Sequence, residues 1–451
     1  MRPATAHQPA VLPPPRKRIF AARPISSPRP FRDGSRLIMA TIITGTLVGI
    51  GAIAFHHLAD TLGDLLFVWA NAHRPMGRVP VVLIIPTVGL GLIGLTLQLL
   101  PQGRIGGVKE VFESLKHSQG IIPFSRIINV LLSGLVLAFG GSVGPEGPMV
   151  QMGALIGSLV GQSTGISGGR LKTIVRAGAA AGIAAAFRSP AGGVLLVLEI
   201  FGARFNGALT HIGIAAVIGY GIRTVIVGDA YPFRPKLPLG NLPALGLLLL
   251  APLMGLLAAP IGHFFILMFN RFKTVLPGRW PLALRTALGG LMVGVIAIWF
   301  PQVLSAGYPV IKDSLQGAMV FHVFLILMCL KMVATSITFG SGAVGGLFAP
   351  TLVIGAMFGG AFGYGFHYLM PAVAPQPELF VLLGMIVIFG SIVKGYWSGL
   401  LMVADMSNCY HQLLLPGIIA GGISFLISWK LHEHSIFELP IDPARRRSRA
   451  A

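Results

Sequence analysis

Long apolar stretches with very few charged residues dominate the chain. A helix that crosses a membrane needs about 20 mostly apolar residues. The stretches without Asp, Glu, Lys or Arg lie between Arg36 and Asp60, Arg78 and Arg104, Gly147 and Gly169, Lys236 and Arg271, Arg285 and Lys312, and Met406 and Trp429, and the longest runs from Met332 to Pro377. This pattern predicts an all-α polytopic membrane protein with about ten to eighteen helices, counting partial ones.

Glycine and proline interrupt several of these apolar stretches, as in 140–148, 189–193 and 340–350. Inside a membrane the backbone is irregular only where protein or a polar cavity satisfies its N–H and C=O groups. We therefore expect broken and partial-spanning helices that surround a buried site.

The composition supports a membrane protein and excludes several other classes. Of 451 residues, 54% are hydrophobic and 11% are charged, whereas charged residues make up about a quarter of a soluble domain. Disorder is excluded because it requires low hydrophobicity. The two cysteines, Cys329 and Cys409, are too few for a disulfide framework or a multi-cysteine zinc site. We expect no metal ion and no cofactor.

Half of the net charge of +20 lies in two basic tails. Residues 1–36 form a Pro-rich tail with eight Lys and Arg residues and one Asp, and residues 441–451 contain four Arg and one Asp. Because basic segments stay on the cytoplasmic side, we expect both termini in the cytoplasm and residues 37–440 in the cell (inner) membrane. No secretory signal is evident. Attraction to anionic lipid explains the basic tail, and nucleic acid is not expected as a partner.

Two glycine-rich segments resemble each other, one ending at Pro148 and the other at Pro350. A shift of 202 residues superposes these prolines and also three glycines that follow each of them. Weak repeats in transporters mark two halves of inverted topology, with the site near the bilayer midplane. The halves would be residues 37–230 and 237–440. The alternative is that glycine-rich apolar helices resemble each other through composition alone.

The two glycine-rich segments can form an anion site. Pro148 and Pro350 are predicted as first helical positions, where the missing N–H has no cost. The free N–H groups of such helix starts carry the positive end of the helix dipole. Two of these ends that face each other would bind an anion without a full positive charge. Weak binding of this kind permits rapid passage.

Glu146 lies inside the first glycine-rich turn. A carboxylate within the membrane is costly and is a functional candidate. It can occupy the anion site itself and leave when it is protonated, so it would act as a gate or proton carrier. The alternative is a helix-capping glutamate. Glu199 and Asp405 also lie in apolar segments, and their similar places in the two repeats favour structural capping.

At these motifs the chain resembles the CLC family of chloride channels and chloride/proton exchangers. The matching segments are Gly144–Pro148 (GPEGP) and Gly346–Pro350 (GLFAP). A degraded version of the family's first motif is found at Ile105–Val111, and Phe437 stands where the family has a late tyrosine. The likeness covers about residues 37–440.

The resemblance implies an all-helical subunit of two inverted halves, assembled as a homodimer with one anion pathway in each subunit. It implies that Glu146 is the external gate and that chloride or a similar small anion is bound. A regulatory domain pair after the transmembrane domain, and control by ATP, are not expected. The implied anion-binding positions are Gly106, Gly107, Gly147, Leu347, Phe348, Ala349 and Phe437.

Four departures from the family pattern affect this prediction. Gly106 replaces a serine and Phe437 replaces a tyrosine, so two hydroxyl donors to the anion are missing. Each hydrogen bond to a charged group contributes about 1.5–3 kcal/mol, so anion affinity should be weaker unless water or the N–H groups of Gly106 and Gly107 compensate. Pro145 replaces a basic residue. Ile200 stands in the place of the internal proton-transfer glutamate.

Because Ile200 is unable to relay a proton, passive channel-like chloride conduction is the favoured function. Chloride/proton antiport is the alternative, since water or another acid could carry the proton. The choice among chloride, nitrate, bromide and fluoride stays open.

Two other classes of function are open to such a chain, an intramembrane enzyme and a structural membrane protein. An intramembrane metalloprotease would need His-Glu-x-x-His, and neither His432–His434 nor the pair His56–His57 has that spacing. We therefore expect no enzyme and no catalytic residue. The other class is a structural membrane protein whose glycines only permit close helix packing.

Overall fold

The computed structural model describes most of the chain, and the two tails, residues 1–29 and 439–451, fall outside it. The first helix begins at Pro30, so it includes the last residues of the segment that the sequence predicted as a basic tail. Arg and Ser are tolerated in the first turns of a helix, so a helix start within this segment is compatible with its composition. The described residues are 30–72, 78–100, 106–203, 207–228, 230–235, 245–432 and 434–438.

Sixteen α-helices and two short 3-10 helices form the described part of the chain, which contains no β-strand. The helices of the first half are α1 (Pro30–Ala72), α2 (Arg78–Leu99), α3 (Val108–His117), η1 (Phe124–Arg126), α4 (Ile127–Ala138), α5 (Glu146–Ser163), α6 (Gly168–Phe187), α7 (Pro190–Phe201) and α8 (Ala208–Val227). Those of the second half are α9 (Leu245–Phe272), α10 (Leu282–Trp299), η2 (Pro301–Val303), α11 (Tyr308–Leu315), α12 (Phe321–Ser341), α13 (Phe348–Leu369), α14 (Pro377–Val393), α15 (Tyr396–Ser407) and α16 (Tyr410–Leu431).

Eight helices are long and apolar enough to cross a membrane, namely α1, α2, α8, α9, α10, α12, α13 and α16. Helices at the periphery expose large apolar side chains such as Leu92, Leu249 and Leu426. In water such a surface would be costly, but in a bilayer it contacts lipid. The protein is therefore a multi-pass membrane protein, as predicted.

Several helices are too short to cross. The helices α3, α4, α7, α11 and α15 contain 8 to 12 residues. At about 1.5 Å per residue, twelve residues span roughly 18 Å, compared with about 30 Å of hydrocarbon. The predicted partial-spanning helices are thus confirmed.

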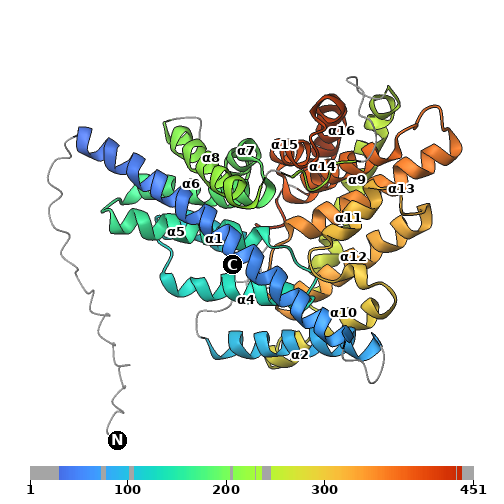
Figure 1. Cartoon of the computed structure of the whole chain (residues 1–451), viewed down its shortest axis with the longest axis horizontal. Coiled ribbons are helices and arrows are strands. Elements are labelled where there is room, and N and C mark those ends of the chain that lie inside the picture. The colour runs from blue at the N-terminus through green and yellow to red at the C-terminus, as the bar shows by residue number, and fades with distance from the viewer. Residues whose placement is uncertain are drawn as a thin grey trace, which may run out of the picture.

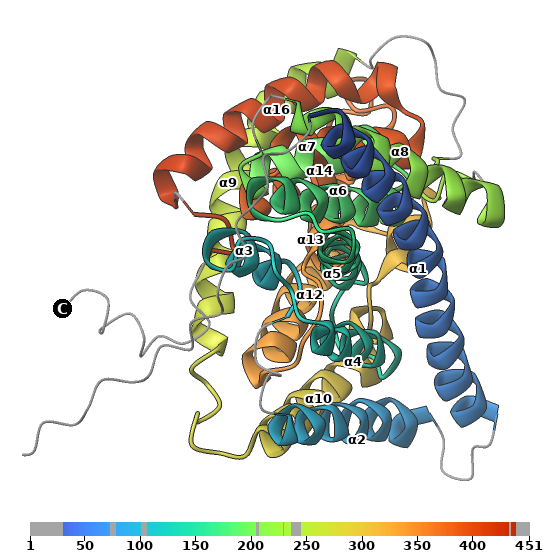
Figure 2. The same ribbon diagram turned by 90° about the vertical axis from the view of Figure 1, so that its left-hand side faces the viewer.

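The α-helices of the two halves match in order, although η1 follows α3 and η2 precedes α11. Figure 1 shows α4 to α8 beside α11 to α16. In Figure 2, α2 and α10, the second helix of each half, lie side by side at one end of the molecule. Gly144 and Gly346 pair with each other in an antiparallel bridge. They are separated by the repeat shift of 202 residues, so equivalent turns meet at a pseudo-two-fold axis between inverted halves.

Glycines allow the central helices to approach closely at equivalent places. A Cβ on Gly153 in α5 would lie 2.1 Å from the carbonyl oxygen of Gly178 in α6. A Cβ on Gly355 in α13 would lie 2.5 Å from the carbonyl oxygen of Gly384 in α14. The repeated glycines seen in the sequence therefore serve helix packing around the turns that contain the site.

Candidate functional site

The candidate site lies where the glycine-rich turns of the two halves meet. The N–H of Gly144 donates to the carbonyl of Gly346 (2.7 Å), and the N–H of Gly346 donates back (3.0 Å). A Cβ on Gly346 would lie 2.6 Å from the Gly144 oxygen and 2.7 Å from the Gly147 nitrogen. Only glycine permits this approach, so the turns position α5 and α13 relative to each other.

The helices begin two residues earlier than the sequence predicted. The helix α5 begins at Glu146 and α13 at Phe348, which makes Pro148 and Pro350 third rather than first helical positions. The N–H groups of the whole first turn lack a partner within the helix, so proline is tolerated at the third position for the same reason as at the first. The free N–H groups still lie at the two helix starts, but they belong to residues before the prolines.

Glu146 is buried, with 1% of its surface exposed, and its carboxylate lies at the N-terminus of α13. The N–H of Ala349 donates to Oε2 (3.2 Å), and the hydroxyl of Tyr308 donates to Oε1. A Cβ on Gly144 would lie 2.4 Å from Oε2. Gly144 therefore provides the space in which the carboxylate reaches the positive end of the opposite helix.

The other predicted residues of the third motif lie buried next to Ala349 at the start of α13. Leu347 is 5% exposed and Phe348 and Ala349 are fully buried, and Gly147 is buried beside Gly346. The ring of Phe437 lies 5.2 Å from the ring of Phe348. The structure thus brings the second motif, the third motif and the late aromatic residue together.

The first motif contacts the site differently from the prediction. Ile105 lies outside the described residues. The N–H of Gly107 donates to Oε1 of Gln151 (2.6 Å), so this N–H, which the sequence predicted to bind the anion, has a protein acceptor. A buried N–H needs an acceptor, and α5 provides one. A Cβ on Gly107 would lie 3.4 Å from the Gly345 oxygen, so the motif still borders the junction.

A polar network supports the first motif. The amide nitrogen of Gln151 donates to Glu110 in α3, and Nε of Arg126 lies 2.8 Å from Oε1 of the same carboxylate. The helix α3 is not among the eight candidate spans. Burial raises the pKa of the Glu110 carboxyl, while the charge of Arg126 acts against this rise. The network anchors Gly107 through Gln151.

Glu199 and Asp405 have the structural roles that the sequence predicted. The Glu199 carboxylate accepts the N–H groups of Trp397 (2.7 Å) and Ser398 (3.0 Å) at the start of α15. Asp405 accepts the hydroxyl of Ser189, the residue that caps α7. Each acid thus stabilises the N-terminus of the matching helix in the other half. Ile200 is buried in the apolar core.

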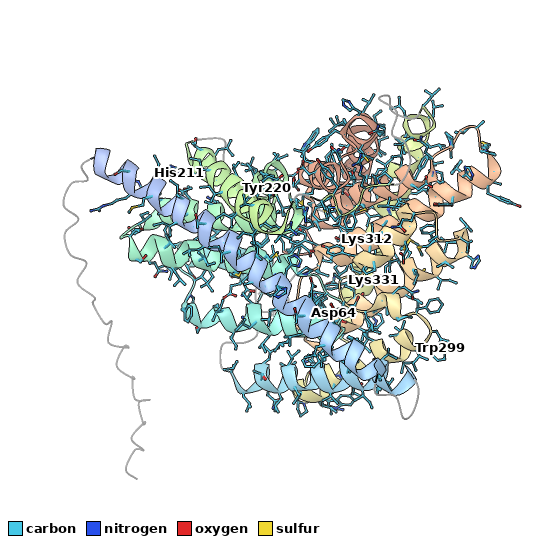
Figure 3. All side chains as sticks on the ribbon, viewed as in Figure 1. Asp64, His211, Tyr220, Trp299, Lys312 and Lys331 are labelled. Carbon is cyan, nitrogen blue, oxygen red and sulfur yellow. The ribbon has the colours of Figure 1, made fainter. Side chains whose placement is uncertain are left out.

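The sequence did not point to two residues, Tyr308, which contacts Glu146, and Lys331, which holds the segment before Tyr308. Tyr308 lies at the start of α11, and Lys331 lies buried in α12, where Figure 3 shows it within the second half. A signal was available, because Gly307-Tyr308 follows Gly107-Val108 by 200 residues and both glycines precede a short helix. Lys331 is also the charged residue that directly precedes the longest charge-free stretch.

Among the described residues no group of three His, Cys, Asp or Glu side chains could hold a metal ion. The junction provides backbone N–H groups and one hydroxyl as hydrogen-bond donors, and the positive ends of two helix dipoles. These features favour the binding of small anions.

Comparisons with known proteins agree with this chemistry. A family model described as voltage gated chloride channel matches residues 88–429. A protein of Ralstonia nicotianae, provisionally named a ClcB-like chloride channel protein, is 33% identical over 75% of this chain and 80% of its own. The H(+)/Cl(-) exchange transporter ClcA of Vibrio parahaemolyticus is 31% identical over 85% of this chain and 84% of its own.

Solved structures have the same fold. A slow cyanobacterial Cl−/H+ antiporter matches with a TM-score of 0.80 and 22% identity, covering 92% of this chain and 98% of its own. A CLC-type fluoride/proton antiporter matches with a TM-score of 0.75 and 22% identity, covering 90% and 98%. At 22% identity these structures show a shared fold. The family itself is shown by the family model and by the relatives that are more than 30% identical. The chain belongs to the voltage-gated chloride channel (CLC) family, whose members transport anions.

Proposed function

We propose that this protein exchanges chloride for protons across the membrane, with Glu146 as both gate and proton carrier. The observation that carries the proposal is the Glu146 carboxylate at the N-terminus of α13, where it accepts the Ala349 N–H. A carboxylate in that place excludes an anion. Protonation removes the charge of the carboxylate, so the side chain is released from the helix N-terminus. Proton binding and anion entry are therefore linked at one site.

The proposal replaces the channel-like function that the sequence favoured. That preference depended on Ile200, which is unable to relay a proton. One aliphatic side chain leaves other routes open, because water or another acid can carry the proton from the cytoplasmic side. The ClcA relative is an H(+)/Cl(-) exchange transporter and the two solved structures are of antiporters, which favours exchange, whereas the ClcB-like relative is named as a chloride channel protein, which favours a channel.

Membrane orientation and assembly complete the proposal. The basic tails favour cytoplasmic termini, so α1 would start on the cytoplasmic side. The protein would lie in the cell (inner) membrane. It would assemble as a homodimer, as the family does. Glu146 would then face the external end of the pathway. These statements are supported by tail charge and by family resemblance.

Chloride flux from liposomes with a pH probe tests the proposal. A chloride gradient is expected to drive protons uphill, in fixed proportion to chloride, because each cycle protonates the same carboxylate. Chloride flux without proton movement would establish passive conduction instead. Competition by nitrate, bromide and fluoride in the same assay determines the anion preference.

Restoring the missing hydroxyl should strengthen anion binding. A Cβ on Gly106 would lie 3.5 Å from Cβ of Asn129 and 3.6 Å from Oε1 of Gln151, which are ordinary contacts. A hydrogen bond to a charged group contributes about 1.5–3 kcal/mol, so Gly106→Ser should bind chloride roughly tenfold more tightly or better. Isothermal titration calorimetry measures this, with Gly106→Ala as the control without a hydroxyl. Equal affinity of the two variants would remove Gly106 from the anion site.

A further inference from the structure

Tyr308 occupies a special place in the pseudo-symmetry of the fold. It is the first residue of α11 and follows Gly307, whose φ is 82°. The equivalent residue of the first half is Val108, the first residue of α3, which follows Gly107 with φ of 66°. Where the first half has an apolar side chain, the second half has a hydroxyl that reaches Glu146.

The segment before Tyr308 is held by buried hydrogen bonds. The ammonium of Lys331 donates to the carbonyls of Val303 (3.0 Å) and Ser305 (2.8 Å). The hydroxyl of Ser305 donates to the carbonyl of Leu137 (2.9 Å), near the end of α4. The anchored segment therefore connects α12 with the chain that leads into the Glu146 turn.

The ring of Tyr308 is also fixed. It meets the ring of Phe233 edge to face, with 5.5 Å between centroids. Tyr308 is half-buried, and its hydroxyl contacts the buried Glu146 carboxylate. A donor held this firmly keeps its position when its acceptor changes.

The carboxylate of Glu146 thus has two donors from the second half, the Ala349 N–H and the Tyr308 hydroxyl. An anion that replaces the carboxylate oxygens meets the same donors. We propose that the Tyr308 hydroxyl is a hydrogen-bond donor to the transported anion at the site that the Glu146 carboxylate now occupies. The hydroxyl holds Glu146 while the site is closed, and it binds the anion once the carboxylate leaves. This inference rests on the proposed function, because it assumes that Glu146 gives way to an anion.

The Tyr308 hydroxyl would compensate for two hydroxyls that the family pattern has and this chain lacks. Gly106 and Phe437, which stand where the family has a serine and a tyrosine, provide no hydroxyl to the anion. Tyr308 provides one beside Glu146. Anion binding would therefore depend more on the site that the Glu146 carboxylate now occupies than on the positions of Gly106 and Phe437.

The test compares chloride binding by purified Glu146→Ala protein with that of the double variant Glu146→Ala/Tyr308→Phe. Removing the carboxylate leaves the site to chloride, and removing the hydroxyl should then weaken chloride binding by roughly tenfold or more. Titration calorimetry measures both affinities. Equal affinities would overturn the assignment.

A matched control separates lost coordination from general damage. Tyr364 also donates to a carboxylate, that of Glu378 (3.4 Å), but at the start of α14. Tyr364→Phe in the Glu146→Ala background should leave chloride affinity unchanged. If Tyr364→Phe weakens binding as much as Tyr308→Phe does, the effect is structural and the assignment is wrong.

Flux through single variants distinguishes this inference from the proposed function. At chloride concentrations that saturate the site, so that weaker binding does not limit the rate, Tyr308→Phe alone should raise the initial rate of chloride flux severalfold, because Glu146 loses one of the donors that hold it. The thermal midpoint of the variant should stay unchanged. A fall in both flux and thermal midpoint would identify Tyr308 as structural. If instead Glu146→Ala leaves flux and proton movement as in the unmodified protein, the proposed function itself fails, whatever Tyr308 does.

Discussion

Glu146→Gln is expected to transport chloride without moving protons and without the pH dependence of the unmodified protein. The side chain keeps its shape, but it has no charge and binds no proton in the physiological range. The Ala349 N–H and the Tyr308 hydroxyl, which now donate to a carboxylate, would hold an uncharged amide less strongly, because charge-assisted hydrogen bonds are about twice as strong as neutral ones. The gate should therefore be open more often at every pH.

Paired chloride and proton fluxes from liposomes check this prediction. They are measured between about pH 4 and pH 8, because an ordinary glutamate titrates near pH 4.3 and burial raises the pKa of a carboxyl by up to several units. Proton movement should fall to background while chloride flux persists. Glu378→Gln is the matched control, because that carboxylate also accepts a tyrosine hydroxyl but lies outside the site, and it should transport as the unmodified protein does. Retention of proton-coupled, pH-dependent transport by Glu146→Gln would contradict the assignment of the gate.

Gly346→Ala is expected to abolish transport and to lower stability. The new methyl group would lie 2.6 Å from the Gly144 oxygen and 2.7 Å from the Gly147 nitrogen. Both are backbone atoms, so no rotamer change relieves the contact and the turns must separate. The paired hydrogen bonds between Gly144 and Gly346 would then be lost, and Ala349 would move away from Glu146.

Overpacking of a close contact costs about 1–3 kcal/mol, so the thermal midpoint in detergent should fall measurably. Chloride flux measured on the same preparation shows whether the site is lost as well. Gly422→Ala provides the control, since a Cβ at this helical position meets nothing within 4 Å and alanine favours a helix. Normal transport by Gly346→Ala would show that the turns tolerate separation and that their contact does not position the gate.

The effects at Glu146 and Gly346 concern two different requirements of the same site. Glu146 provides the titrating group, and Gly346 provides the approach of the opposite helix that gives this group its partners. Loss of the first should leave a folded, uncoupled transporter. Loss of the second should damage the assembly of the two halves.

The sequence alone determined the class of protein and the repeat, and it singled out Glu146 as the candidate gate. Apolar stretches of spanning length and scarce charge are direct consequences of a lipid environment, so they can be read without a fold. The shift of 202 residues was also visible, because equivalent turns need the same glycines and prolines. Glu146 could be identified because a lone acid in such a turn is costly unless it has a function.

Only the tertiary structure decided which groups meet Glu146. Tyr308 follows it by 162 residues, and no local pattern relates a tyrosine at one helix start to a carboxylate at another. The same is true of Gln151. Its side-chain oxygen accepts the N–H of Gly107, which the sequence predicted as a donor to the anion. Hydrogen bonds of this kind depend on how the halves cross, and that crossing is set by backbone contacts between glycines, which are recognisable in the sequence only as small residues.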